Sequence, residues 1–218
     1  MPKNFAIIGL GRFGSSIAVT LCKLGHQVLA VDMNPELVQA ISSHVTHAVE
    51  ADATNERALS QLGIRNFDCV VVSIGDDIRA STLATILCKE MGAAYVIAKA
   101  SDELHAKLLN KTGADKVVLP EWDSGVRLAR SLVSKSVIDY LELSEKYSVS
   151  EMRIPLRWVG KSLAQINVRA RFKVSVIALR RNEKIIIALD PKAPLEANDV
   201  LVLLGANEDL TIIEGMET

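Results

Sequence analysis

A glycine-rich turn near the start of the chain constrains the fold more than any other feature. Gly9, Gly11 and Gly14 have the spacing G-x-G-x-x-G, between a short apolar run and an amphipathic stretch. Asp32 closes the next apolar run. Such glycines let backbone N–H groups approach phosphate closely, and the N-terminus of the helix that follows favours anions. The pattern predicts a phosphate-binding strand–turn–helix unit, with a tight turn that binds nothing as the alternative.

Apolar runs of strand length recur along residues 1–135, with helical segments between them. The six predicted strands are Asn4–Ile8, Gln27–Val31, His47–Ala51, Cys69–Ile74, Tyr95–Ala98 and Lys116–Leu119. The predicted helices are Phe13–Leu24, Pro35–Ser42, Glu56–Leu62, Asp77–Met91, Asp102–Lys111 and Ser124–Ser134, with Asn34 and Ser101 as caps. Short, continuously apolar strands are typical of parallel sheets buried on both faces. We therefore predict an α/β fold with a doubly wound, Rossmann-type parallel sheet.

The pattern changes after residue 135. Val137, Ile138, Leu141 and Leu143 continue a helical period, so we predict a crossover helix or linker over residues 136–148. Residues 149–218 then form a smaller α+β domain. Its predicted strands are Val149–Ile154, Val174–Leu179, Lys184–Ala188 and Val200–Leu204, with a hairpin turn at Arg180–Glu183 and short helices at Ser162–Ile166 and Glu208–Ile213. A domain this small buries little surface alone, so we expect it to pair with a second copy.

The composition excludes several classes of protein. The net charge of −1 gives no basic surface for nucleic acid, and no apolar stretch approaches the length of a membrane span. No signal peptide precedes the first predicted strand. Cys22, Cys69 and Cys88 are scattered through apolar runs, so we interpret them as buried free thiols in a reducing cytosol.

Polar residues follow the predicted strands at the edge where doubly wound sheets bind ligands. Asp32 is expected to bond ribose hydroxyls, unless it caps a helix or lies in a solvated turn. An acid here disfavours a 2′-phosphate, so the ligand is NAD-like or ATP-like rather than NADP-like. Asp52 follows the third strand and Ser73 and Gly75 follow the fourth. Alternatively, Asp52 caps the helix that starts near Glu56. The alternative for Ser73 and Gly75 is a plain turn that binds nothing.

Three further residues lie near the same predicted edge. Lys99 ends the fifth strand, where it is able to face phosphate or to be a surface lysine. His105 lies one turn into the next helix, where it could point at the site. The alternative for His105 is a structural role. Glu121 follows the sixth strand, and a carboxylate beside polyphosphate requires a cation between them. The alternative for Glu121 is an acid favoured by a helix N-terminus.

The chain shows no pattern of catalytic residues. The tail from residue 149 contains no histidine and no cysteine, which argues against hydride chemistry. We therefore predict a protein that is not an enzyme, with an NAD(H)-dependent oxidoreductase as the alternative. A redox-sensing transcription regulator needs a DNA-binding element, and neither the charge nor a helix-turn-helix pattern supplies one.

Several segments together resemble a known family. They resemble segments of the cytosolic regulatory subunits of Ktr potassium-uptake systems, within the RCK or TrkA-N class. The segments are GLGRFG, VDMN, DAT, SIGDD, AKA and GADKVVLPE. The resemblance covers the whole chain, including an RCK-C (TrkA-C) tail with NDVLVLLG. It implies an octameric ring of dimers, peripheral on the cytoplasmic face of the membrane, that regulates a potassium-translocating membrane subunit. It also implies binding of ATP or ADP, with NAD or NADH in some members.

The resemblance also implies particular contacts. Carried over to this sequence, the nucleotide contacts are Gly11, Arg12, Asp32, Met33, Asn34, Asp52, Ala53, Ile74, Gly75, Lys99, Ala100, Ser101, His105 and Glu121. Gly9, Phe13, Gly14, Thr54 and Ser73 complete the candidate set. Arg12 would reach the terminal phosphate of a nucleotide on the neighbouring subunit. Glu121 would lie near a Mg or Ca ion between the two nucleotides of a dimer.

The tail of this family often binds cyclic di-AMP at a dimer interface. The segment INVRARFKV resembles that motif, and the implied contacts are Val168, Arg169, Phe172 and Val174, with Pro194 opposite. Arginine suits both phosphate and the face of a purine. A basic surface loop is the alternative, and which basic residue of the segment faces a ligand is open.

Overall fold

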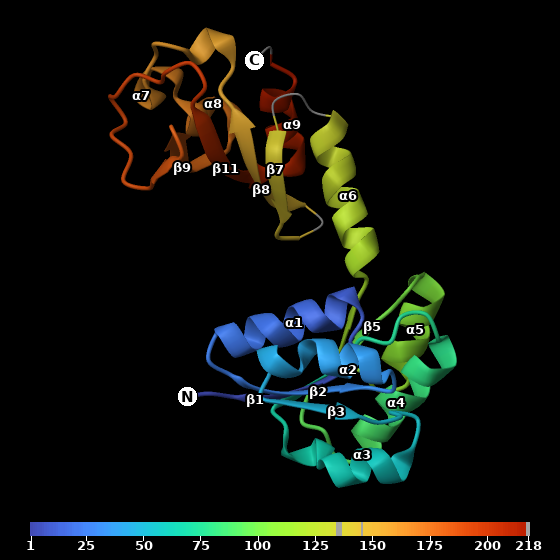
Figure 1. Cartoon of the computed structure of the whole chain (residues 1–218). Helices are drawn as coiled ribbons and strands as arrows, with labels where there is room; N and C mark the ends of the chain where they lie inside the picture. The colour runs from blue at the N-terminus through green and yellow to red at the C-terminus, as the bar shows by residue number, and fades with distance from the viewer. Residues whose placement is uncertain (134–136, 145, 217–218) are drawn as a thin grey trace. The chain divides into compact units, whose positions relative to one another are not determined.

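Two compact units make up the structure, a computed structural model that describes residues 1–133, 137–144 and 146–216 (Figure 1). The first unit is Met1–Trp122 and the second is Asp123–Thr218. The first unit has strands β1 (Asn4–Ile8), β2 (Gln27–Asp32), β3 (His47–Glu50), β4 (Cys69–Val72), β5 (Val96–Lys99) and β6 (Lys116–Val118). Its helices are α1 (Arg12–Lys23), α2 (Pro35–Ile41), α3 (Glu56–Leu62), α4 (Ile78–Glu90) and α5 (Glu103–Lys111), with 3-10 turns η1 (Ser42–His44) and η2 (Ile64–Asn66).

The strands of the first unit form one parallel sheet in the order β3-β2-β1-β4-β5-β6. Strand β1 pairs with both β2 and β4, so Ile8 lies between Val31 and Val72. The strand order reverses at β1 and β4, and the loops after these two strands therefore diverge to opposite faces of the sheet. A crevice at the carboxyl edge of the sheet results at this point. The predicted doubly wound parallel sheet is confirmed.

Helices cover both faces of this sheet (Figure 1). Successive residues of a strand point to opposite faces, and Ile7 and Ile8 accordingly join different buried clusters. Ile7 packs with Ala18 of α1 and Ile41 of α2. Ile8 belongs to the cluster that includes Leu59 of α3 and residues of α4 and α5. The continuous apolar character of the strands follows from this two-sided burial.

The second unit is an α+β domain, as predicted. Helix α6 (Pro120–Val133) begins at the end of the first unit and continues into the second. The strands are β7 (Val137–Glu142), β8 (Tyr147–Arg153), β9 (Ser175–Arg181), β10 (Lys184–Ile186) and β11 (Val200–Ala206), in one antiparallel sheet ordered β10-β9-β11-β8-β7. The remaining helices are η3 (Leu156–Trp158), α7 (Leu163–Ile166), α8 (Val168–Phe172) and α9 (Asn207–Glu214). Phe172, Leu203 and Leu210 share one buried cluster, so α8, β11 and α9 enclose a common core.

The predicted hairpin is present between β9 and β10, but its turn is shorter than the predicted Arg180–Glu183, because Arg180 and Arg181 belong to β9. Its two turn residues, Asn182 and Glu183, have φ angles of 48° and 66°. Two-residue hairpin turns favour this left-handed conformation because it matches the twist of the flanking strands. Helix α8 was not predicted, and it occupies the segment that the sequence suggested as a ligand-binding motif.

The predicted helix after residue 135 is wrong. Residues 137–142 form strand β7, which pairs antiparallel with β8, Tyr140 opposite Ser150 and Leu141 opposite Val149. The expected apolar helical face does not exist, because Tyr140 packs on the core whereas Leu141 is 56% exposed. Pairing with a neighbouring strand outweighs a helical period this short. The predicted boundary at residue 135 and the first residue of the predicted linker, Ser136, lie outside the described residues.

The three cysteines are free, as predicted, but their surroundings differ. Cys69 and Cys88 are buried, and burial raises the pKa of Cys69 to about 11 and that of Cys88 to about 12. Cys22, on α1, is half-buried rather than buried. Among the described residues, none of the helices has the length and apolar character of a membrane span.

Candidate functional site

The glycine loop between β1 and α1 is shaped by contacts that only glycine permits at two positions. Gly9 has a φ of 93°, in the region where side chains are strained. A Cβ at Gly14 would overlap the Gly9 carbonyl oxygen and Ser73 Oγ. A Cβ at Gly11 would meet no described atom within 4 Å, and the φ of Gly11 is an ordinary −64°. Gly9 and Gly14 are therefore explained by the fold, whereas Gly11 leaves open space beside the N-terminus of α1.

Ser73 connects the loop after β4 to the glycine loop. Its buried hydroxyl Oγ lies 2.5 Å from the carbonyl oxygen of Gly9 and 3.1 Å from that of Ile8, and donates to them. Its backbone N–H also donates to the Ile8 carbonyl at 2.7 Å. The two loops at the strand-order reversal are thus held together by one side chain, so Ser73 is more than a turn residue.

Asp32 connects the glycine loop to the end of β2. Its Oδ2 accepts from the backbone N–H of Leu10 at 2.6 Å, and its Oδ1 accepts from that of Asn34 at 2.8 Å. Asn34 is the residue that caps α2, through a bond of 2.9 Å from the N–H of Glu36. The alternative of Asp32 as a helix cap is therefore excluded, and its carboxylate is fixed toward the loop.

Asp52 has a similar position after β3. Its Oδ1 accepts from the N–H of Thr54 at 2.8 Å and from the Thr54 hydroxyl at 2.7 Å. The cap of α3 is Asn55, which accepts from the N–H groups of Arg57 and Ala58, so Asp52 does not serve as that cap.

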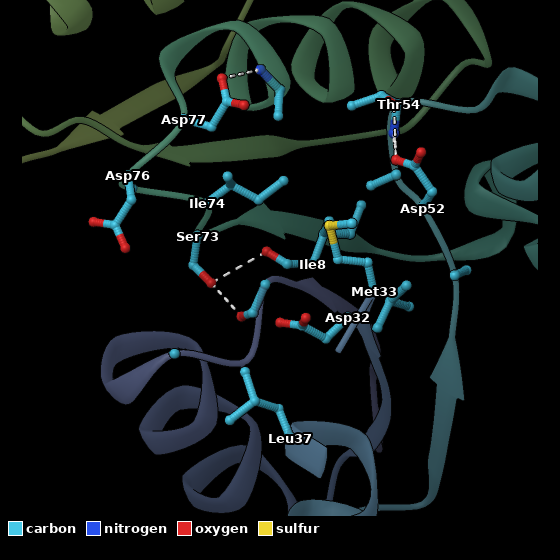
Figure 2. A pocket seen from close by; sticks show the side chains of 17 residues that line it. Ile8, Asp32, Met33, Leu37, Asp52, Thr54, Ser73, Ile74, Asp76 and Asp77 are labelled. Carbon is cyan, nitrogen blue, oxygen red and sulfur yellow. Dashed lines mark hydrogen bonds between the residues drawn. The ribbon is translucent and has the colours of Figure 1, made fainter. Parts of the chain in front are cut away.

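These loops surround a cavity of about 310 Å³ at the carboxyl edge of the sheet (Figure 2). Ten of the candidate residues line it: Gly9, Gly11, Asp32, Met33, Asp52, Ala53, Thr54, Ser73, Ile74 and Gly75. Seven lining residues were missed by sequence reasoning: Ile8, Val31, Leu37, Ala51, Asp76, Asp77 and Ala80. Most of these adjoin the ends of β1 to β4, so the strand-end rule that selected their neighbours would have found them.

The charge around this cavity is negative. Asp32, Asp52, Asp76 and Asp77 line it, and among the described lining residues there is no lysine, arginine or histidine. Asp77 caps α4 by accepting from two backbone N–H groups, chiefly that of Ala80, which lowers the pKa of its carboxyl. The cavity therefore suits an uncharged, hydroxyl-rich group with an apolar portion better than it suits phosphate itself.

The cationic candidates form a separate cluster beside the glycine loop. Lys99 Nζ lies 2.7 Å from Glu121 Oε1 and 6.0 Å from the centre of the Phe13 ring. The hydrogen bond from Lys99 is the largest cause that lowers the pKa of Glu121, and the charge of exposed Arg12 contributes in the same direction. Lys99 is thus a paired lysine, and Glu121 is close enough to Arg12 for the charge of Arg12 to stabilise its carboxylate.

Ser101, which precedes α5 and follows the buried residue Ala100, contacts His105 in the first turn of that helix. The N–H of Ser101 donates to His105 Nδ1 at 3.2 Å, which leaves the proton of a neutral ring on Nε2. His105 is 1% exposed, and burial lowers its pKa, with Asp102 opposing that shift. The prediction that Ser101 caps α5 is wrong, because Asp102 caps it by accepting from the N–H of His105 at 2.8 Å.

His105 has one unsatisfied atom. Within the part of the chain that the structure describes, its buried Nε2 has no hydrogen-bond partner. An orphaned buried donor costs about 1–3 kcal/mol, so its position favours a ligand or partner that accepts a hydrogen bond.

The predicted metal ion is not supported by one chain alone. The described residues contain no group of three or more His, Cys, Asp or Glu side chains able to hold an ion. Glu121 supplies a single carboxylate, and its observed partner is an ammonium group. The donor set of this chain therefore does not fit a resident cation.

The candidates in the second unit have two different environments. Val168, Phe172 and Val174 are buried in the core. Arg169 and Pro194 are exposed, and Pro194 forms an isolated bridge with Ser162. Arg169 and Pro194 are thus the two of these five candidates with a side chain free to meet a ligand.

Comparison with known proteins agrees with this architecture. The TrkA-N domain model matches residues 5–120, and the TrkA-C domain model matches residues 149–211. The chain belongs to the TrkA-N and TrkA-C family.

Two relatives from Bacillus subtilis (strain 168) span nearly the whole chain. The Ktr system potassium uptake protein A is 43% identical over 97% of this chain and 96% of its own length. The Ktr system potassium uptake protein C is 39% identical over 98% of this chain and 97% of its own length. A solved structure, the GsuK channel bound to NAD, has a TM-score of 0.71 at 16% identity, covering all of this chain and 40% of that one. This likeness confirms the fold.

Proposed function

We propose that the chain is the regulatory subunit of a Ktr-type potassium uptake system, and that adenine nucleotides bound in its first unit control the activity of that system. The supporting observation is the cavity at the strand-order reversal, enclosed by the glycine loop, Asp32 and Asp52. Two relatives that are 43% and 39% identical over nearly the full chain carry the name of this uptake system.

The nucleoside occupies the cavity and the phosphates lie outside it. Asp32 uses one lone pair of each oxygen for backbone N–H groups, and the others remain able to accept from ribose hydroxyls. The acidic lining repels phosphate, which is drawn instead to the space over Gly11, the N-terminus of α1, Arg12 and Lys99. ATP and ADP fit this arrangement, with the nucleoside in the cavity and the phosphates outside it. NAD or NADH fits the same arrangement as a longer ligand.

Assembly is part of the proposal. Copies of the chain form dimers and an octameric ring, which docks on the cytoplasmic face of the membrane subunit that translocates potassium. Leu104 on α5 is 77% exposed and Leu132 on α6 is 76% exposed, and large exposed apolar side chains suit contacts between copies. In the second unit, Arg169 and Pro194 bind cyclic di-AMP at such a contact.

Control by nucleotide requires different contacts for ATP and ADP in two conformations of the ring. Exposed Arg12 supplies that difference by reaching the terminal phosphate on the neighbouring subunit. We predict that Arg12→Ala leaves ADP binding nearly intact and removes the preference for ATP, as measured by isothermal titration calorimetry. Arg65→Ala, at an exposed position on η2, serves as the control. Equal losses for ATP and ADP would contradict this role.

A thermal-shift panel tests the proposed function directly. The full chain is heated with ATP, ADP, NADH or cyclic di-AMP, each with EDTA, Mg²⁺ or Ca²⁺. A ligand at one hundred times its Kd stabilises the folded state by about 2.7 kcal/mol, which is readily detected. The absence of a shift with both adenine nucleotides would refute the proposal. Turnover of NADH with an added electron acceptor would favour the alternative function, an oxidoreductase. It would contradict the proposal that the protein is a regulatory subunit without enzymatic activity.

A further inference from the structure

The loop between β10 and β11 is bonded on one side to a single arginine. Arg181 is the last residue of β9. Its Nε and Nη2 atoms donate to the two carboxylate oxygens of buried Asp199, which directly precedes β11. The same Nη2 donates to the backbone carbonyl oxygen of Pro194 at 3.2 Å. One guanidinium thus ties the middle of the loop to the buried residue at its end.

The same loop is also bonded to the segment that leads into α7. The backbone N–H of Leu195 donates to the carbonyl oxygen of Lys161 at 3.0 Å, and that of Gly160 donates to the Leu195 carbonyl at 2.8 Å. Pro194 forms an isolated bridge with Ser162, which is the cap of α7. The backbone of the loop is therefore held by both α7 and β9, although Pro194 itself is exposed.

The two exposed candidates for the second-messenger site are supported in different ways. Arg169 belongs to α8, where Val168 and Phe172 on either side of it are buried in the core. Core packing therefore fixes the helix that carries Arg169. Pro194 lies on a loop, and its position depends on the bond from Arg181 and on the bridge to the start of α7. Ordering a loop on binding lowers affinity, so a loop that is already held binds a ligand more tightly.

We propose that Arg181 is a positioning residue for cyclic di-AMP, which acts by holding Pro194 where the ligand meets it. The inference rests on the proposed function, because it concerns the site suggested there at Arg169 and Pro194. The guanidinium also donates from Nη1 to Glu196 Oε1 at 2.5 Å, so it bonds Asp199, Glu196 and Pro194 together. Only the planar fork of donors of an arginine has the geometry for all of these bonds.

Arg181→Lys in the full chain separates this role from the stability of the fold. The lysine keeps a positive charge against buried Asp199, but its single ammonium does not reproduce the bond to the Pro194 carbonyl. We expect the affinity for cyclic di-AMP, measured by isothermal titration calorimetry, to fall about fivefold as the loop loosens. Arg180→Lys is the matched control, the same change at the preceding residue, which pairs with Glu151 at 3.0 Å. Its affinity for cyclic di-AMP should equal that of the wild type.

Two further measurements distinguish positioning from a general loss of structure. In a Pro194→Ala background, Arg181→Lys is expected to change the affinity for cyclic di-AMP by less than about twofold, because the contact through which Arg181 acts has been removed. Ile213→Val removes one methylene group from the core of the same unit. It is expected to lower the urea midpoint and to leave the affinity for cyclic di-AMP unchanged.

An unchanged affinity in Arg181→Lys would overturn the inference, and so would an equal loss with and without Pro194. A comparable loss in Arg180→Lys or Ile213→Val would overturn it too, because any weakening of the second unit would then have the same effect. In each of these cases, binding by the wild type would leave the proposed cyclic di-AMP site intact. A wild type that does not bind cyclic di-AMP refutes that part of the proposed function together with the inference, and leaves the binding of ATP and ADP as a separate question.

Discussion

The two units use their polar side chains in opposite ways. In the first unit, Asp32 and Ser73 bond the backbone of loops at one edge of the sheet and so hold a cavity open. In the second, Arg181 bonds both carboxylate oxygens of Asp199, at 2.8 and 2.6 Å, and also reaches Glu196. Asp199 is 1% exposed, so its charge is used inside the fold. Polar side chains thus hold the loops around a cavity in one unit and form an internal ion pair in the other.

The strongest test of this contrast removes the internal pair. Arg181→Met leaves the buried Asp199 without a counterion, and we expect the second unit to lose about 3 kcal/mol of stability. Chemical denaturation followed by tryptophan fluorescence measures the loss, since Trp158 is buried in the same core. ADP affinity should be unchanged at temperatures where the variant is folded. A large fall in ADP affinity would break the distinction between the units.

A smaller effect is expected from Ser73→Ala in the first unit. The Gly9 carbonyl loses its hydroxyl donor, which should cost about 1–2 kcal/mol. Because the glycine loop then relaxes, ADP should bind about tenfold more weakly, a ratio equivalent to about 1.4 kcal/mol. The control is Ser42→Ala, which removes an exposed bond to the Gln39 carbonyl. Unchanged ADP affinity in Ser73→Ala would show that the loop keeps its shape unaided.

The smallest effect concerns pH. Burial lowers the pKa of His105 below its ordinary value of 6.5, so the unfolded chain binds more protons than the folded one as the pH falls through that value. The first unit should therefore lose stability as the pH falls below 6.5, and regain it as the pH rises. Urea midpoints at pH 7.5 and 5.5 measure the slope. His105→Asn retains an acceptor for the Ser101 N–H and should reduce this dependence of stability on pH. An identical slope in the variant would show that other titratable groups cause it.

The contrast between the units also explains what the sequence could predict. Continuous apolar strands, the glycine spacing and Asp32 predicted the parallel sheet and most of the cavity, because these signals are local and the topology brings strand ends together. The pairing of Lys99 with Glu121 depends on two strand ends separated along the chain, so no local pattern reveals it.

The errors have the same origin. Residues 137–142 pair with β8 instead of forming a helix, since the partner strand rather than the local period decides their structure. Both Ser101 and Asp102 have side chains suited to cap α5, so the local sequence does not distinguish them, and the structure has Asp102 as the cap.

The unequal burial of the cysteines has a practical consequence. Cys69 and Cys88 lie in the core and, with pKa values raised to about 11 and about 12, remain protonated thiols at neutral pH. Half-buried Cys22 is more accessible, near the end of the helix whose first turn borders the glycine loop. A maleimide dye should therefore attach preferentially at Cys22, which labels the first unit without any engineered residue.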